Sequence, residues 1–239
     1  MEGVFRHAAA QQGRIDLVLS NLYRADCPLD LEGFRRAPLA TEPFPHLVMP
    51  NFVKPAAAAA ARAGFPSSGA GGLATAPDPE HLGALDPRFA VLLARLRSPE
   101  TTAAFAEKFG LPLSHEALLV TLRDRCRPQD GRIHTDSESK LVTALVYLND
   151  GWEPEGGRLR LLRRIDDMED MIAEVPPLDG TLVAFRRTDN SFHGHKPYDG
   201  VRRYVMLNWM VDAGAAHREA MRHGLSSVWK KLTGGLHSF

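Results

Sequence analysis

Residues 132–137 contain two side chains that could share a metal ion. His134 and Asp136 stand two positions apart, and residues two apart on a β-strand point to the same face. An imidazole and a carboxylate then supply two ligands, which rarely hold a transition metal firmly. His193, much later in the chain, can supply a third. Two histidines and one carboxylate leave coordination positions open, as in non-haem iron sites that bind dioxygen.

His195 competes with His193 for the third position. The two histidines share a face if their strand is regular, so alternation alone does not separate them. An isolated His-x-Asp pair also has a simpler explanation, a histidine bonded to a surface carboxylate. A later histidine and then an arginine, each at the edge of a predicted strand, favour the metal-site interpretation.

Short apolar runs separated by turn residues make up the chain from Ala117 onward. Pairs such as Asp150-Gly151 and Asp179-Gly180 mark the turns. Many short strands with such turns predict a barrel or a double-sheet jelly roll. The predicted strands are residues 118–122, 141–148, 158–162, 181–185 and 204–211.

Helices are expected before this region. Pro55 begins an alanine-rich stretch, and proline is tolerated in the first turn of a helix. Ser98-Pro99-Glu100 predicts the start of another helix and Gly110 its end. A short strand is expected at residues 45–49. The chain is therefore expected to be α+β, with helices first, a β core from about residue 115, and a helical tail.

The composition is that of a soluble globular protein. The chain has 239 residues, 44% hydrophobic and 24% charged, and 29 basic residues balance 29 acidic ones. A net charge of zero and the absence of a polybasic or long apolar run argue against nucleic-acid and membrane partners. Cys27 and Cys126 lie outside any metal-ligand spacing, so we expect free thiols and a cytoplasmic protein.

Several motifs follow one another in a fixed order. They are His134-Thr135-Asp136, the run LVTALVYLN at 141–149, Gly156-Gly157-Arg158-Leu159, DGTLVAF at 179–185, Ser191-Phe192-His193-Gly194, and GVRRY at 200–204 leading to Trp209. The string is highly specific over residues 134–209. With it, the region from about residue 43 to residue 211 resembles the 2-oxoglutarate oxygenases of the prolyl-hydroxylase type.

The resemblance implies a fold and a cofactor set. The fold is a double-stranded β-helix, a cupin-like jelly roll with N-terminal helices packed on one sheet. The cofactors are iron(II), 2-oxoglutarate and dioxygen, with succinate and carbon dioxide as coproducts. Residues 1–41 would be an N-terminal extension, residues 42–213 the oxygenase domain, and residues 214–239 a C-terminal helical tail.

The resemblance also implies residue roles. The iron ligands are His134, Asp136 and His193, and His195 then supports the ligands or faces the substrate. Arg203 binds the distal carboxylate of 2-oxoglutarate, which suits its fork of donors. Other positions that line the cosubstrate pocket are Tyr147, Thr143, Leu159 and Trp209.

Arg202 competes with Arg203 for the carboxylate. The spacing to His193 and to Trp209 favours Arg203. Alternation would place Arg203 inside the barrel with Val205, Leu207 and Trp209, and Arg202 outside in solvent. One departure from the family pattern stands nearby: Cys126-Arg127-Pro128 has arginine where close relatives carry an aromatic residue beside the pocket.

The predicted reaction is hydroxylation of a small-molecule or peptidyl substrate. Asp136 argues against the halogenating branch, which leaves that ligand position free for chloride. The rival hypotheses are a non-catalytic jelly-roll binding or scaffold module, and a metal-bound jelly roll that takes no 2-oxoglutarate. The shared cosubstrate motifs do not specify the substrate, because specificity lies in the surrounding loops.

Overall fold

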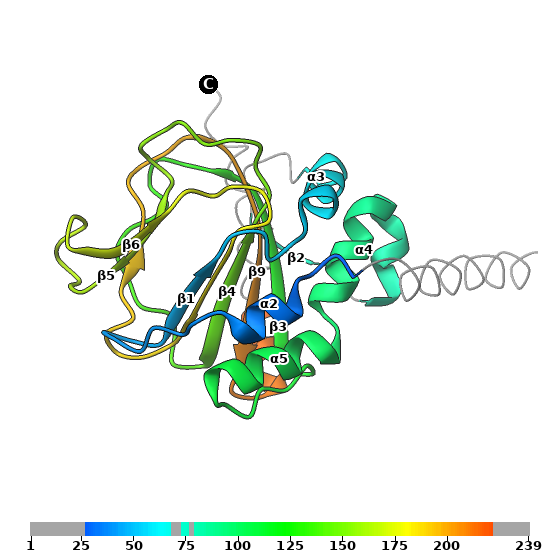
Figure 1. Cartoon of the computed structure of the whole chain (residues 1–239), viewed down its shortest axis with the longest axis horizontal. Coiled ribbons are helices and arrows are strands. Elements are labelled where there is room, and N and C mark those ends of the chain that lie inside the picture. Colours follow the sequence, from blue (N-terminus) through cyan, green and yellow to red (C-terminus); the bar gives the residue numbers. More distant parts are fainter. Residues whose placement is uncertain (1–26, 68–72, 77–78, 222–239) are drawn as a thin grey trace, which may run out of the picture.

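The computed structural model describes residues 27–67, 73–76 and 79–221. Most of the predicted N-terminal extension and the end of the predicted tail lie outside these residues. The described part has three layers (Figure 1): helices, a large antiparallel sheet, and a small sheet on the far side. No helix among the described residues is long and apolar enough to cross a membrane.

The large sheet has six strands. Their order is β1 (His46–Met49), β7 (Leu182–Arg186), β4 (Lys140–Tyr147), β9 (Gly200–Met210), β3 (Leu118–Cys126) and β2 (Leu73–Thr75). The small sheet has the order β6 (Met171–Val175), β5 (Leu159–Leu162) and β8 (His193–Gly194). An isolated antiparallel bridge between His134 and His193 adds one more segment to the edge at β8.

The helices cover one face of the large sheet (Figure 1). They are α2 (Leu31–Arg36), α3 (Pro55–Ala63), α4 (Pro87–Leu96) and α5 (Pro99–Phe109), with a short 3₁₀ helix, η1 (Pro79–Ala84). A further helical segment at residues 213–221 packs on the opposite face, where Ala215 contacts Leu119 and Met210. The predicted ends of α5 are confirmed. The Ser98 hydroxyl accepts the amide hydrogen of Thr101, and Gly110 ends the helix in the left-handed region at φ 63°.

Two hydrophobic clusters separate the layers. The larger one fills the space between the helices and the large sheet, where the rings of Phe105 and Trp209 lie 4.5 Å apart. The smaller one lies between the two sheets and contains Tyr147, Leu159 and Tyr204. This arrangement confirms the predicted α+β class and the packing of helices on one sheet. Strands β2, β6 and β8 are short, and the apolar pattern of the sequence did not predict them.

The orientation of β9 differs from the expected one. Val205, Leu207 and Trp209 pack against the helices instead of lining the barrel interior. Residues of the other parity, Tyr204 and Met206, belong to the cluster between the sheets. The expectation was wrong because β9 is a central strand buried on both faces, and such a strand is apolar on both.

Trp209 provides a test of this orientation. Its Nε1 donates to the hydroxyl of Thr102 in α5 at 3.1 Å, and Trp209 itself is fully buried. Trp209→Phe and Thr102→Val should each lower the free energy of unfolding by about 1–2 kcal/mol. The double variant should lose about 1 kcal/mol less than the sum of the two, as urea unfolding would show. Strict additivity would argue that Trp209 does not use this contact.

Candidate metal centre and cosubstrate pocket

The three predicted ligands lie together at one end of the space between the sheets. His134, Asp136 and His193 each offer a ligand atom, and these atoms lie within 4.8 Å of one another. Two backbone hydrogen bonds between His134 and His193, of 3.0 and 3.1 Å, set the two histidines opposite each other, with ring centroids 4.3 Å apart. The residues that the sequence separates most widely are thus direct neighbours in the fold.

Backbone carbonyls orient both imidazole rings. His134 Nδ1 lies 2.8 Å from the carbonyl oxygen of Arg132, and His193 Nδ1 lies 3.0 Å from that of Ser191. A carbonyl oxygen only accepts, so Nδ1 of each neutral ring carries the proton. The lone pair is therefore on Nε2, the nitrogen left free to bind a metal.

The Asp136 carboxylate is held by two donors. Lys140 Nζ donates to Oδ1 at 2.7 Å, and the Thr143 hydroxyl donates to Oδ2 at 2.5 Å. Burial of Asp136 raises its pKa, but the charges and hydrogen bonds of Lys140, His193 and Thr143 outweigh burial and lower the pKa to about 2. The carboxylate is thus ionised at neutral pH.

His193 is held in its neutral form. Burial lowers its pKa to about 4, although the nearby Asp136 charge acts in the opposite direction. A neutral imidazole and an ionised carboxylate are the forms that coordinate metals. The donor set therefore fits a divalent transition metal such as iron(II).

Arg202 reaches the interior of the barrel, which corrects the expected orientation of the two arginines. Its side chain is buried, with 2% of the residue exposed. Nε donates to the carbonyl oxygen of Gly157 at 2.7 Å, and Nη2 donates to the Tyr147 hydroxyl at 3.2 Å. The guanidinium also lies over the rings of Tyr147 and Tyr204, about 5 Å from each centroid. It has no carboxylate partner among the described residues.

Arg203 points to the other face of β9. It is half-buried, on the side that carries Val205, and its backbone amide donates to Asn149 Oδ1 at 2.8 Å. The expectation that Arg203 faces inward and Arg202 outward was wrong. Trp209, on the same face as Arg203, is likewise absent from the interior. Thr143, Tyr147 and Leu159 do face inward, as expected.

His195 lies apart from the three clustered ligands. Its Nε2 is 3.6 Å from Cys126 Sγ, and its Nδ1 is 2.8 Å from the carbonyl oxygen of Lys196. Burial lowers the pKa of His195 to about 4 and raises that of the Cys126 thiol. Gly131, at φ +87°, allows this ring to approach, since a Cβ there would lie 2.4 Å from it. Cys27 and Cys126 are both free thiols, as expected.

Residues 122–211, the stretch that holds the three clustered ligands and Arg202, match the family model described as the 2OG-Fe(II) oxygenase superfamily. This stretch of the chain is similar to that superfamily. Enzymes of the superfamily use iron(II), 2-oxoglutarate and dioxygen, and the match indicates a 2-oxoglutarate-dependent oxygenase. A search of curated protein sequences gives no match.

Solved structures show the same fold. A Pseudomonas putida prolyl-4-hydroxylase is 21% identical with a TM-score of 0.52, over 69% of this chain and 85% of its own. A Phytophthora capsici prolyl 4-hydroxylase is 19% identical with a TM-score of 0.51, over 69% of this chain and 58% of its own. The predicted jelly-roll core is therefore confirmed.

Two polar residues of this oxygenase site escaped the sequence analysis. Lys140 contacts Asp136, and Asn208 Oδ1 lies 2.9 Å from the Thr143 hydroxyl oxygen. Asn208 carried a usable signal, because it is the polar residue that interrupts the apolar run 204–210. Had Asn208 been assigned to the face of the strand that points to the metal site, alternation would have placed Arg202 on that face as well.

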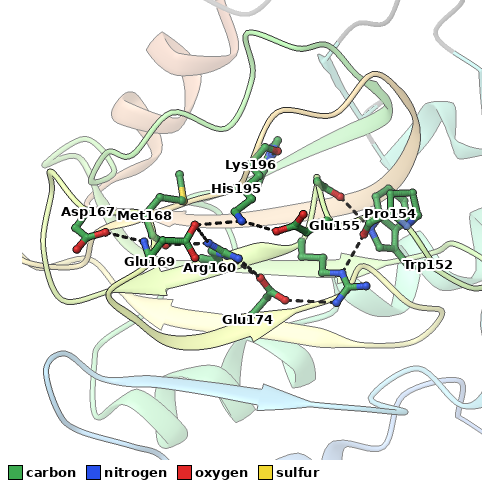
Figure 2. Close-up of polar contacts among 12 residues, drawn as sticks. Trp152, Pro154, Glu155, Arg160, Asp167, Met168, Glu169, Glu174, His195 and Lys196 are labelled. Carbon is green, nitrogen blue, oxygen red and sulfur yellow. Dashed lines mark hydrogen bonds and ion pairs between the residues drawn. The ribbon is translucent and has the colours of Figure 1, made fainter.

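A cluster of basic residues after Gly157 is neutralised by carboxylates on the outer face of the small sheet. Figure 2 shows Arg160 between Glu174 and Glu169, and Lys196 between Glu155 and Glu169. These ion pairs tie the loop 163–170 and the loop near Glu155 to the residues just after β8. The ion pairs of Arg160 and Lys196 therefore support β8, the strand that carries His193, from the outer face of the small sheet.

Arg160 should contribute to stability more than its neighbour Arg163. The Arg160 side chain is 4% exposed and that of Arg163 55%. Arg160→Met leaves two carboxylates close together, so we expect a loss of about 1–3 kcal/mol in unfolding free energy, less than for a fully buried pair because Glu169 is exposed. Arg163→Met should cost less than about 0.5 kcal/mol. If urea unfolding shows equal losses of unfolding free energy in Arg160→Met and Arg163→Met, the ion pairs of Arg160 do not have this stabilising role.

Proposed function

We propose that the protein is a hydroxylase that couples oxidation of an organic substrate to decarboxylation of 2-oxoglutarate, releasing succinate and carbon dioxide. The observation that carries this proposal is the pairing of a three-ligand cluster with a buried arginine that has no carboxylate partner in the described part of the chain. This chemistry requires two sites: a set of metal ligands, and a cationic group that binds the distal carboxylate of 2-oxoglutarate.

His134, Asp136 and His193 are the proposed iron ligands. With 2-oxoglutarate and dioxygen, iron(II) at this site supplies the oxidation of a substrate C–H bond. The chain contributes orientation: the carbonyl oxygens of Arg132 and Ser191 fix the two imidazoles, and Thr143 fixes the carboxylate of Asp136. Lys140 keeps that carboxylate ionised and balances part of its charge.

Arg202 is the proposed receptor for the distal carboxylate of 2-oxoglutarate, in place of Arg203. A buried cation is costly unless an anion compensates it. Gly157 and Tyr147 offer Arg202 a carbonyl and a hydroxyl oxygen but no negative charge. Tyr147 supplies a second donor for the same carboxylate, and Leu159 and Thr143 form walls of the pocket.

The rival hypothesis is a non-catalytic jelly-roll binding or scaffold module. Such a module has no need for converging ligand atoms or for a buried arginine without a counter-ion. Hydroxylation of a small-molecule or peptidyl substrate therefore remains the favoured function. The names of the two neighbouring structures suggest a prolyl residue as one peptidyl candidate.

Substitution of His193 and of His195 tests which of the two histidines binds the metal. The protein with iron(II) and 2-oxoglutarate should form succinate, and His193→Ala should abolish both bound iron and succinate because one of three ligands is lost. His195→Ala should retain bound iron, since the His195 ring contacts Cys126 instead. Metal content after gel filtration and succinate by mass spectrometry check this. Iron loss only in His195→Ala would reverse the assignment.

Arg202 and Arg203 provide a variant and a matched control for a test of 2-oxoglutarate binding. Arg202→Met should raise the Kd of 2-oxoglutarate about a hundredfold or more, because a buried charge pair is broken. Arg203→Met should leave it nearly unchanged, since Arg203 faces the other side of β9. Calorimetric titration of 2-oxoglutarate into anaerobic, iron-loaded protein measures both constants. A large effect of Arg203→Met alone would contradict the proposed role of Arg202.

A further inference from the structure

A second group of basic side chains lines the inner wall beside Arg202. Arg123 lies on β3 directly opposite Tyr204 of β9, and facing residues of an antiparallel pair point to the same side of the sheet. Tyr204 is the residue whose ring lies under the Arg202 guanidinium. Arg123 therefore enters the interior that holds the proposed cosubstrate pocket.

Asp130 pairs with both arginines of this wall. Arg123 Nη1 donates to Asp130 Oδ2 at 2.9 Å, and Arg127 Nη2 lies 3.6 Å from Oδ1. The backbone amide of Arg127 donates to Oδ2 as well. Two guanidinium groups thus share one carboxylate, which leaves one positive charge without a carboxylate partner among the residues that the structure describes.

The surrounding groups do not remove this charge. Cys126, the neighbouring thiol, is neutral near pH 7 because burial raises its pKa. Asp124 lies next to Arg123 in sequence, but it accepts a hydrogen bond from Ser67, which precedes β2. Arg125 is exposed.

Three buried polar atoms on this wall have no hydrogen-bond partner among the described residues. They are Nε of Arg123, Nε of Arg127 and the hydroxyl oxygen of Thr121. Thr121 stands two residues before Arg123, so it shares the inner face, and it is fully buried. Buried polar groups without partners are uncommon, and each calls for an explanation such as a bound ligand.

We propose that Arg123 and Arg127 form an anion subsite, with Thr121 beside it, that receives a carboxylate of the organic substrate. One net positive charge matches a monoanion, and a guanidinium binds carboxylates through directed, charge-assisted hydrogen bonds. The two carboxylates of 2-oxoglutarate are assigned elsewhere, to the metal and to Arg202. This inference rests on the proposed oxygenase function and narrows its substrate to a carboxylate-bearing molecule or side chain.

Propionate and its neutral analogue propionamide test this subsite in the whole anaerobic protein with iron(II) and saturating 2-oxoglutarate. Saturation-transfer NMR should show binding of propionate and not of propionamide. Arg123→Met and Arg127→Met should each raise the Kd of propionate, Arg123→Met by at least about tenfold. Arg125→Met, an exposed change on the same strand, should leave it unchanged. Asp130→Asn, which removes the shared negative charge, should not weaken propionate binding.

Three outcomes overturn the inference. They are no binding of propionate to the unmodified holoprotein, equal binding by Arg123→Met, and an equal loss in Arg125→Met. In the second case, weaker 2-oxoglutarate binding by Arg123→Met would assign Arg123 to the cosubstrate site. Calorimetric titration of 2-oxoglutarate in the same samples tests the proposed function separately. If the proposed function itself fails, the unmodified protein binds no 2-oxoglutarate.

Discussion

Alternation of side chains along β9 is the constraint on which both halves of the molecule depend. One face of this central strand carries Val205, Leu207 and Trp209 into the helix layer. The other face carries Arg202 and Tyr204 to the small sheet and the candidate metal centre. A shift of one residue would exchange the two faces. The same packing that stabilises the helices therefore sets which arginine faces the space between the sheets.

Electrostatics inside the barrel follow from this geometry. Lys140 and Thr143 hold Asp136 ionised, and burial keeps His193 neutral. Arg202 lies farther along the same interior without a carboxylate partner among the described residues. Thr143 contacts Asp136 and Tyr147 contacts Arg202, both from the inner face of β4, so a molecule with a carboxylate at each end matches the two sites in charge. 2-Oxoglutarate is such a molecule.

Much of this could be predicted from sequence, and the misses have physical reasons. The clustering of three candidate ligands was predicted because His134 and Asp136 are two apart on an extended segment and His193 sits in a specific motif. The ends of α5 were predicted because Ser98 and Gly110 are local signals. The faces of β9 were not, because a strand buried on both sides has no polar face to identify. Lys140 and Asn208 act through contacts that only the folded sheet creates.

The most direct test of the account is optical. Anaerobic addition of iron(II) and 2-oxoglutarate to the metal-free protein should produce the visible charge-transfer band of an iron-chelated keto acid. The band requires the three ligands to hold iron and the pocket to hold the cosubstrate at once. Folded protein with saturating iron and 2-oxoglutarate but no band would contradict the account and favour a non-catalytic binding module.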